Sequence, residues 1–278
     1  MKKLMLAVSA CALMAGAASA EDVKIGILIG FTGPIESLTG HMANAAEAAM
    51  AEVNASGKAK NNYISVRGDD TCTDAAAATA AAERAVTAEG VKGIIGGDCS
   101  GVTRAMLTNV AMPNGIVMVS PSATSPALTA DPDNGLFFRT APSDAREGEV
   151  MADILTEKGV KSIALTYSNS DYGKGLAEAI ASAFTAKGGV VTINAAHDDG
   201  KADYSAEVAA LAAAGGDLLV VAGYLDQGGK GIIQASLDSG AFSTFGLPGG
   251  MVGDSLPAAI GPALDGSYGQ VAQSDSPG

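Results

Sequence analysis

The chain has 278 residues, with 30 acidic and 17 basic side chains, and therefore a formal net charge of −13 at pH 7. Such an acidic chain lacks the basic surface of a nucleic-acid-binding protein and is a poor match for an anionic membrane surface. Tryptophan is absent and glycine occurs 36 times, so we expect a core of small aliphatic residues with helices packed closely on sheets.

The first twenty residues have the pattern of a secretory signal. Lys2 and Lys3 precede an apolar stretch from Leu4 to Ala17, and Ala18-Ser19-Ala20 is a small-residue cleavage site. The stretch is shorter than the roughly 20 residues that a membrane span needs. Val8-Ser9-Ala10-Cys11 is also similar to a lipid-attachment box, which is the alternative. We therefore expect export, after which the mature chain carries 30 acids and 15 bases, a charge of −15.

Apolar runs then alternate with helical patterns along the whole chain. The expected strands are 23–29, 63–67, 94–95, 116–119, 136–140, 162–167, 190–194, 217–222 and 242–247. The expected helices are 41–55, 73–88, 102–110, 143–158, 172–187, 204–211 and 227–237, and 30–39 is expected to be a loop. This β-α-β-α order predicts α/β architecture with parallel sheets and helices on both faces.

The pattern restarts after a turn at residues 131–135. We therefore predict two Rossmann-like lobes with a hinge between them, because no low-complexity linker separates the halves. The first lobe is expected to span residues 21–140 and the second lobe residues 141–270. Residues 271–278 are expected to begin a return to the first lobe.

Two cysteines, Cys72 and Cys99, remain after export to an oxidising compartment. Each follows a predicted strand, at 65–67 and 94–95, and neighbouring parallel strands would bring the two side chains together. We predict a disulfide, with two free thiols as the alternative. Closing a loop of this length stabilises a chain by roughly 3–4 kcal/mol in the chain-entropy description.

Two neighbouring strand-like runs end in hydroxyl-rich turns, at 97–101 and 120–126. In an open parallel sheet, ligands bind at the carboxyl ends of the strands. Helix N-termini there offer free N–H groups and a partial positive charge, which suit a small anion such as a carboxylate. Ser100, Ser122 and Thr124 are therefore candidate ligand-binding residues, although plain helix capping explains the same pattern.

The ordered set of these motifs resembles the type I periplasmic substrate-binding proteins of ABC transporters, of the leucine/isoleucine/valine-binding kind. The resemblance covers essentially the whole exported chain. The residues that carry it are Gly33-Pro34, Asp69 to Cys72, Gly97 to Ser100, Ser120 to Thr129, Phe138 to Thr140, Asp171 to Leu176 and Ala222 to Tyr224.

By that resemblance, the ligand lies between the lobes and the protein is periplasmic. The first lobe holds the amino-acid backbone through Ser100 and through Ser122, Ala123 and Thr124. Tyr172 and Tyr224 close over the ligand from the second lobe, and Gly249 occupies a further contact position. A disulfide between Cys72 and Cys99 would fix the turn that contains Ser100.

Three features depart from the family pattern. An acid that usually pairs with the ligand ammonium is replaced by Gly249. One explanation is that another acid pairs with the ammonium group, and Asp226 is the nearest candidate. The simpler interpretation of Asp226 is an exposed helix cap. The other explanation is that the ligand is not a standard α-amino acid. Leu38 or Thr39 stands where an aromatic residue is frequent. The chain also ends about a hundred residues early, so we expect a C-terminal truncation that leaves the first lobe incomplete, a naturally short protein being the alternative.

The expected function is an extracytoplasmic receptor that delivers a small branched-chain amino acid to an ABC permease. The alternative is a receptor or sensor of the same fold for an amide, urea or aromatic carboxylate. An exported enzyme is the third possibility, but no histidine base lies near a serine, and no Gly-x-Ser-x-Gly elbow or Walker-type lysine is present. His41 and His197 lie in unrelated segments, so we expect no metal and no cofactor, and we expect a monomer.

Overall fold

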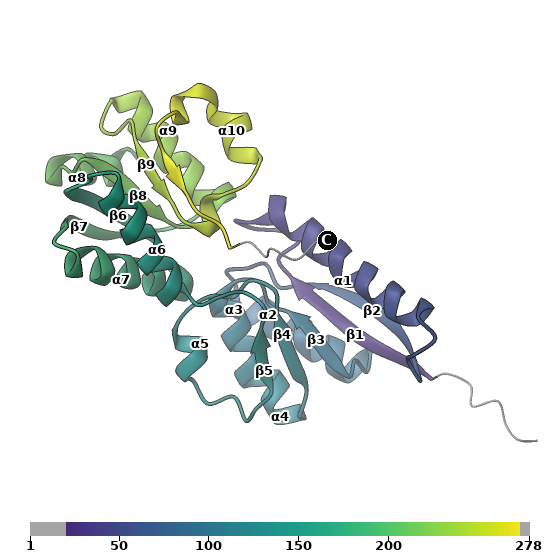
Figure 1. Cartoon of the computed structure of the whole chain (residues 1–278). Coiled ribbons are helices and arrows are strands. Elements are labelled where there is room, and N and C mark those ends of the chain that lie inside the picture. Colours follow the sequence, from purple (N-terminus) through teal and green to yellow (C-terminus); the bar gives the residue numbers. More distant parts are fainter. Residues whose placement is uncertain (1–20, 273–278) are drawn as a thin grey trace, which may run out of the picture.

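The computed structural model describes residues 21–272, so the predicted signal segment and residues 273–278 lie outside the described part (Figure 1). Two five-stranded sheets form the fold, with strand orders β2-β1-β3-β4-β5 and β10-β9-β8-β6-β7, and every strand pairing is parallel. This arrangement confirms the predicted α/β class with two parallel-sheet lobes.

The first sheet contains β1 (Asp22–Ile29), β2 (Asn62–Asp69), β3 (Gly93–Gly96), β4 (Val117–Ser120) and β5 (Phe137–Arg139). Its helices are α1 (Glu36–Ala55), α2 (Ala75–Glu83), α3 (Ser100–Met106), α4 (Met112–Asn114) and α5 (Ala127–Ala130). Two π-helical segments, η1 (Arg84–Ala88) and η2 (Leu107–Ala111), extend α2 and join α3 to α4.

The second sheet contains β6 (Ser162–Ser168), β7 (Val190–His197), β8 (Leu218–Ala222), β9 (Phe245–Leu247) and β10 (Tyr268–Gly269). Its helices are α6 (Asp144–Glu157), α7 (Asp171–Ala186), α8 (Ser205–Ala214), α9 (Lys230–Ser239) and α10 (Ser255–Ile260). Shorter helical segments are η3 (Leu225–Gly229), η4 (Gly249–Met251) and η5 (Gly261–Leu264).

Both sheets have the same topology, since the second repeats the order 2-1-3-4-5 of the first when its strands are counted from β6. In this order the connection reverses direction between the first and third strands, and ligands bind at that point, outside the carboxyl ends of the strands. The ends of β1 and β3, and those of β6 and β8, are therefore the expected walls of a site.

Helix capping explains several element boundaries. The side chain of Asp74 accepts hydrogen bonds from Ala76 N and Ala77 N at the start of α2. Ser143 accepts one from Ala145 N at the start of α6. Helix α1 begins at Glu36, so the predicted loop is shorter than expected.

Each sheet is covered on both faces. Figure 1 shows α1 on one face of the first sheet and α2 and α3 on the other, and the buried residues agree, since Ile27 and Ile29 pack with Ala43 of α1. In the second sheet α6 and α7 cover one face and α8 and α9 the other. Alanine and branched aliphatic side chains fill these layers, as the composition predicted.

Within residues 21–272, no helix is long and apolar enough to cross a membrane. The lobe boundaries at residues 140 and 270 stay a prediction, although the sheets divide between β5 and β6.

Candidate functional site

A cavity of about 860 Å³ lies between the carboxyl ends of the two sheets. The side chains that border it come from both sheets. Six of the predicted contact residues border it, namely Ser100, Ser122, Thr124, Tyr172, Tyr224 and Gly249. Ala123, the seventh, is fully buried behind this wall, where its carbonyl oxygen accepts a hydrogen bond from Arg139 at 3.2 Å.

The first wall is built from the two hydroxyl-rich turns, which hydrogen bonds tie together. Ser120 Oγ donates to the carbonyl oxygen of Gly97 at 2.5 Å, and Ser122 Oγ donates to that of Asp98 at 3.0 Å. The backbone N–H of Ser125 donates to Ser100 Oγ at 3.1 Å. Strands β3 and β4 are adjacent, so the prediction that these two turns meet is confirmed.

The helices after these turns differ from each other. α3 begins at Ser100 with Cys99 in the cap position, so the first amides of a helix lie at the cavity wall without intrahelical acceptors. The second turn is also followed by a helix, but this is the four-residue α5, with Pro126 in the cap position and no side-chain cap bond. The two turns therefore lead into helices of different length.

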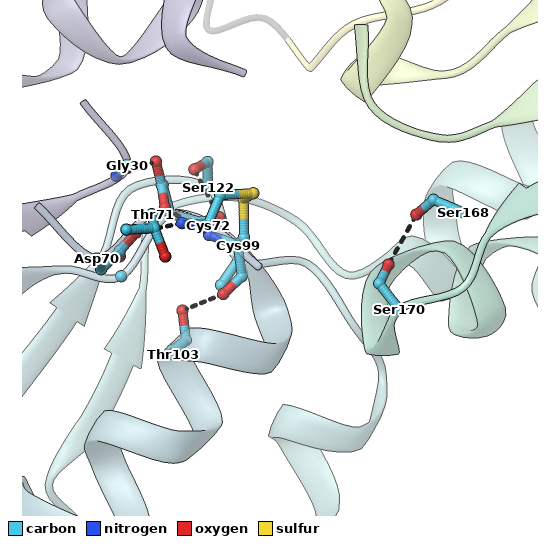
Figure 2. The surroundings of a disulfide bond; sticks show 12 residues. Gly30, Asp70, Thr71, Cys72, Cys99, Thr103, Ser122, Ser168 and Ser170 are labelled. Atoms are coloured by element: carbon cyan, nitrogen blue, oxygen red, sulfur yellow. Dashed lines mark hydrogen bonds between the residues drawn. A yellow bond between two sulfur atoms is a disulfide. The ribbon is translucent and has the colours of Figure 1, made fainter. Parts of the chain in front are cut away.

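The disulfide between Cys72 and Cys99 is present, with the two Cα atoms 5.1 Å apart, which confirms that prediction. The reason given for it was wrong, because β2 and β3 are not neighbours and β1 lies between them. The bridge crosses the carboxyl end of β1, where a Cβ at Gly30 would lie 3.1 Å from Cys72 Cβ. Figure 2 shows Gly30 and Ser122 beside the bridge.

Two buried carboxyl groups accept hydrogen bonds from the backbone of the two bridged cysteines. Asp70 Oδ1 accepts a hydrogen bond from Cys72 N, and Asp98 Oδ1 accepts one from Cys99 N. Asp98 Oδ2 also accepts the N–H of Gly30 at 2.8 Å. Burial raises the pKa of both carboxyl groups, and the nearby charge of Asp98 raises that of Asp70 further. These groups fix the turn that begins α3.

The second wall contains two stacked tyrosines. The rings of Tyr172, at the start of α7, and Tyr224, after β8, have centroids 5.1 Å apart and an interplanar angle of 26°. Tyr172 Oη accepts the N–H of Gly250 at 3.1 Å. Both rings are nearly fully buried, and burial raises the pKa of both phenols. The pair therefore presents two neutral aromatic rings to the cavity.

Two acids of α6 were missed as site residues by the sequence reasoning. Glu147 borders the cavity, and its Oε1 accepts the backbone N–H of Gly249 at 2.5 Å. Asp144 is fully buried, its N–H donates to the carbonyl oxygen of Thr124 at 2.9 Å, and neither of its side-chain oxygens has a hydrogen-bond partner. Their spacing of three residues on a helix, which places both on one face, was the available signal.

Burial changes the protonation of these acids. Burial and the neighbouring Glu147 together raise the pKa of Asp144 to about 8, against the opposing effects of Thr124 and Arg139. Burial also raises the pKa of Glu147, which the hydrogen bond from Gly249 partly offsets. Each carboxylate would gain from a positively charged partner in the cavity.

The candidate substitute acid, Asp226, is used elsewhere. Its Oδ1 lies 2.7 Å from Lys230 Nζ, and its Oδ2 accepts a hydrogen bond from Ser37 Oγ at 2.7 Å. Its N–H donates to the carbonyl oxygen of Pro34 at 2.8 Å. These contacts join the start of α1 to η3, so Asp226 links the two halves instead of facing the cavity. The hypothesis that it replaces the acid at position 249 is therefore wrong.

Apolar residues close one side of the cavity. Leu38 borders it, together with Ile35, Met42 and Val252. Thr39, the other residue considered for this position, is buried and donates its hydroxyl to Glu36 O at 3.2 Å. An aliphatic wall thus occupies the position where the family resemblance implies an aromatic side chain.

Among the described residues, no group of three or more histidine, cysteine or acidic side chains is placed to hold a metal ion. His197 is buried in the second lobe, where Nδ1 lies 2.8 Å from Thr166 Oγ1. His41 borders the cavity on α1.

Comparison with known proteins places this geometry in a family. The sequence profile described as periplasmic binding protein matches residues 22–277. The Leu/Ile/Val-binding protein homolog 3 of Brucella melitensis is 32% identical over 234 residues, 82% of this chain and 61% of that protein. The Leu/Ile/Val-binding protein of Escherichia coli is 31% identical over 251 residues, 90% of this chain and 67% of that protein.

Solved structures show the same fold. A branched-chain amino acid transporter substrate-binding protein from Streptococcus pneumoniae, in complex with isoleucine, aligns with a TM-score of 0.78 and 24% identity over 90% of this chain and 70% of that chain. A solute-binding protein from Rhodopseudomonas palustris in complex with 4-hydroxybenzoate aligns with a TM-score of 0.73 and 21% identity, over 86% of this chain and 65% of that chain.

The chain spans about two thirds of the length of these relatives, between 61% and 70%. The match nevertheless runs through both sheets and through both walls of the cavity. The chain belongs to the periplasmic binding protein family, as a type I member of the leucine/isoleucine/valine-binding group.

Proposed function

We propose that this protein is an extracytoplasmic receptor that binds a small branched-chain amino acid between its lobes and delivers it to the permease of an ABC transporter. The make-up of the cavity carries the proposal. Hydroxyl groups and helix amides form one wall, and Tyr172, Tyr224 and Glu147 form the other. An amino acid has a carboxylate and an ammonium group, and each needs its own hydrogen-bonding partners when removed from water. Relatives named for binding leucine, isoleucine and valine support the proposal.

The carboxylate end of the ligand fits the first wall. Ser100 lies at the start of α3, where free helix amides favour an anion. Thr124 Oγ1 is buried at the cavity and has no hydrogen-bond partner, so its hydroxyl is available to a ligand. Ser122 contributes from the neighbouring turn, with Ala123 behind it.

The side chain of the ligand fits the apolar wall of Ile35, Leu38, Met42 and Val252. These residues come from α1 and from the segment after η4, so both lobes contribute to the wall. Burial of an aliphatic side chain there gains roughly 1.5–3 kcal/mol. A branched aliphatic ligand uses this surface, whereas a polar side chain does not.

Hinge closure is the proposed mechanism, without chemistry on the ligand. A ligand held by both walls binds the closed form more tightly than the open form and so shifts the population toward it. Contacts across the cleft accompany closure. Asp226 bonds to Ser37 on one side, and Arg104 lies 3.6 Å from Asp171 on the other.

We also propose that the protein is exported to the periplasm through a cleaved signal and that it is a monomer. Its lobes are proposed to span residues 21–140 and 141–270. The family description supports the periplasmic location. N-terminal sequencing of the exported protein tests the cleavage, with Glu21 expected as the first residue. An intact N-terminus, or a lipid on Cys11, would contradict it.

The aromatic-carboxylate alternative remains a second candidate because Gly249 lacks the family acid. Solved structures with 4-hydroxybenzoate share only the fold with this chain. The second wall opposes a ligand whose only charge is negative, because Glu147 borders the cavity and Asp144 lies behind it. We therefore favour an amino acid.

Isothermal calorimetry and thermal-shift measurements test the proposal directly. The panel contains L-leucine, L-isoleucine, L-valine, 4-hydroxybenzoate, acetamide and urea. We expect binding of the branched-chain amino acids and an increase in Tm that grows with ligand concentration. A protein that responds to none of the amino acids contradicts the proposal, and a response to 4-hydroxybenzoate alone would establish the alternative.

A further inference from the structure

Position 249 and Glu147 lie in direct contact, although 102 residues separate them in the chain. A Cβ at Gly249 would lie 3.2 Å from Glu147 Oε1 and 3.8 Å from Glu147 Oε2. The carboxylate of Glu147 therefore occupies the space beside position 249. An acidic side chain built at residue 249 would compete with Glu147 for that space.

Glu147 does not serve α6 as a cap. The cap of this helix is Ser143, which accepts the N–H of Ala145, and Glu147 lies one residue beyond the usual partner position of a capping box. Its side chain instead turns to η4 in the second lobe and borders the cavity. Glu147 Oε1 holds the Gly249 amide, and the side chains of Asp144 and Gln270 lie close enough to lower the pKa of this carboxyl group by hydrogen bonding.

The nearest cationic side chains are engaged elsewhere. Arg146 also borders the cavity, but its guanidinium donates to Glu149 at 2.8 Å. Arg139 donates to the carbonyl oxygens of Ala123 and Ser125 and to Thr129 Oγ1. The half-buried carboxylate of Glu147 thus forms no ion pair among the described residues.

A second observation concerns Asp144, the other acid on this face of α6. Asp144, one turn earlier on the same face of α6, is 0% exposed, and both of its side-chain oxygens lack hydrogen bonds. Thr124 Oγ1, which borders the cavity beside it, is also buried without a partner. Buried polar atoms are rarely left unpaired in native proteins. Asp144 lies behind the 860 Å³ cavity, next to Thr124 and Glu147, and its unpaired oxygens add negative character to the corner that Glu147 borders.

We propose that Glu147, supported by Asp144, binds the ammonium group of the ligand in place of the acid missing at position 249. The inference rests on the proposed function, because it assigns one end of an amino acid to this corner. Tyr172 places its hydroxyl in the same corner through its bond from Gly250. The acids thus select a ligand with a positively charged amino group and reject its analogue without one.

Three probes test the inference on the full chain, namely L-leucine, 4-methylpentanoate, which is leucine without its amino group, and 3-methylbutylamine, which lacks the carboxylate. In the parent protein we expect leucine to bind at least a hundredfold more tightly than 4-methylpentanoate. In Glu147→Gln we expect leucine affinity to fall at least tenfold, while the affinity for 4-methylpentanoate is unchanged or rises. The ratio of the two affinities within one variant is the readout, because a folding defect weakens both ligands.

The most discriminating variant places an acid at position 249 in a protein that lacks the Glu147 carboxylate. We expect Glu147→Gln combined with Gly249→Glu to regain most of the lost leucine affinity. Gly249→Glu alone should weaken leucine binding, because two carboxylates then share one corner. Glu157→Gln is the matched control, since Glu157 is exposed at the far end of α6, and it should change neither ligand.

The outcomes separate this inference from the proposed function. If leucine, isoleucine and valine all fail to bind the parent protein, the proposed function is wrong and the inference falls with it. If leucine binds the parent and Glu147→Gln retains the parental ratio of leucine to 4-methylpentanoate affinity, the receptor stands and the inference is wrong. Equal binding of leucine and 4-methylpentanoate by the parent overturns the inference as well.

Discussion

The two walls of the cavity come from sheets with the same strand order, yet they present opposite chemistry. The first wall consists of serine and threonine turns tied to one another and to a disulfide. The second wall consists of stacked tyrosines and of acids from α6. The shared topology fixes where a ligand binds, and the side chains at the strand ends decide which end of the ligand each wall receives.

The walls also differ in how they are stabilised. In the first wall, buried carboxyl groups accept backbone N–H groups, so Asp98 has partners for both oxygens. In the second wall, Asp144 has none for its side-chain oxygens. The turns of the first wall are therefore held by hydrogen bonds within the protein, with Asp70 Oδ2 and Thr124 Oγ1 unpaired, whereas Asp144 behind the second wall has neither oxygen paired. The following experiments probe that difference, beginning with the largest expected effect.

The pH dependence of stability reports on the unsatisfied acid. Because the pKa of Asp144 rises from 3.8 to about 8 on folding, the folded protein binds its proton more tightly than the unfolded chain. This contribution to the stability is fully present below about pH 4 and is lost as the pH rises toward 8, by at most about 6 kcal/mol. Urea denaturation of the unliganded protein across this range should show the decline, and Asp144→Asn should make it shallower. Parallel profiles for the two proteins would contradict the buried, unpaired state of Asp144.

Removal of the disulfide tests what holds the turns of the first wall. Cys72→Ala combined with Cys99→Ala should lower the free energy of unfolding by about 3–4 kcal/mol, since the unfolded chain regains the entropy of an open loop. Urea denaturation measures the loss, and the parent protein in dithiothreitol serves as the comparison. Leucine affinity should also fall, because the turn containing Ser100 loosens. An unchanged unfolding midpoint would show that the bridge is absent in solution.

Two hydroxyl deletions test the carboxylate end. Ser100→Ala and Thr124→Ala should each weaken leucine binding by about 1–3 kcal/mol if the hydroxyls are buried ligand contacts. Ser100→Ala should also lower stability, because Ser125 N loses its acceptor, whereas Thr124→Ala should not. Calorimetry and thermal unfolding together separate the two effects. Unchanged affinity in both variants would reduce these residues to structural roles.

Tyr172→Phe tests the aromatic wall without removing its ring. The Gly250 amide loses its acceptor at 3.1 Å, so we expect about 1 kcal/mol of weaker leucine binding and a similar loss of stability. Tyr63→Phe is the control, because Tyr63 lies on β2 away from the cavity. An equal effect of the two substitutions would mean that the hydroxyl of Tyr172 plays no special part.

The smallest expected effect concerns the contact between the two halves. Asp226→Asn removes the charge that faces Lys230 and weakens the bonds from Ser37, so the closed form should lose less than about 1 kcal/mol. The ligand dissociation rate, measured by stopped flow, should rise a few fold. Asp153→Asn, which breaks the exposed pair with Lys187 away from the cavity, is the control. A faster release in both variants would indicate a general charge effect.

Much of the fold could be predicted because its signals are local. The alternation of apolar runs and helical patterns predicted the strands β1 to β9, and the caps at Asp74 and Ser143 were visible from side-chain type and position. Strand β10 and the helical segments between residues 249 and 264 were missed, because they are short and depend on packing against β9 and α9.

The prediction of the disulfide shows how a correct result came from an incomplete argument. The cysteines follow β2 and β3, and the sequence contains no signal that β1 inserts between these strands. Sheet order results from long-range pairing and from the handedness of the crossover connections, and composition does not reveal it. The bridge exists because it passes over Gly30, which has no side chain to block it.

The sequence by itself determined the parallel α/β class, the hydroxyl-rich turns that form the first wall, and a glycine at position 249, where the family resemblance predicts an acid. Only the tertiary structure decided what stands beside that glycine. Glu147 and Gly249 are 102 residues apart and meet because α6 and η4 converge at the carboxyl ends of the strands. Local propensity can position a residue along a helix, but the neighbour across a cleft is set by sheet order and by the crossing between lobes.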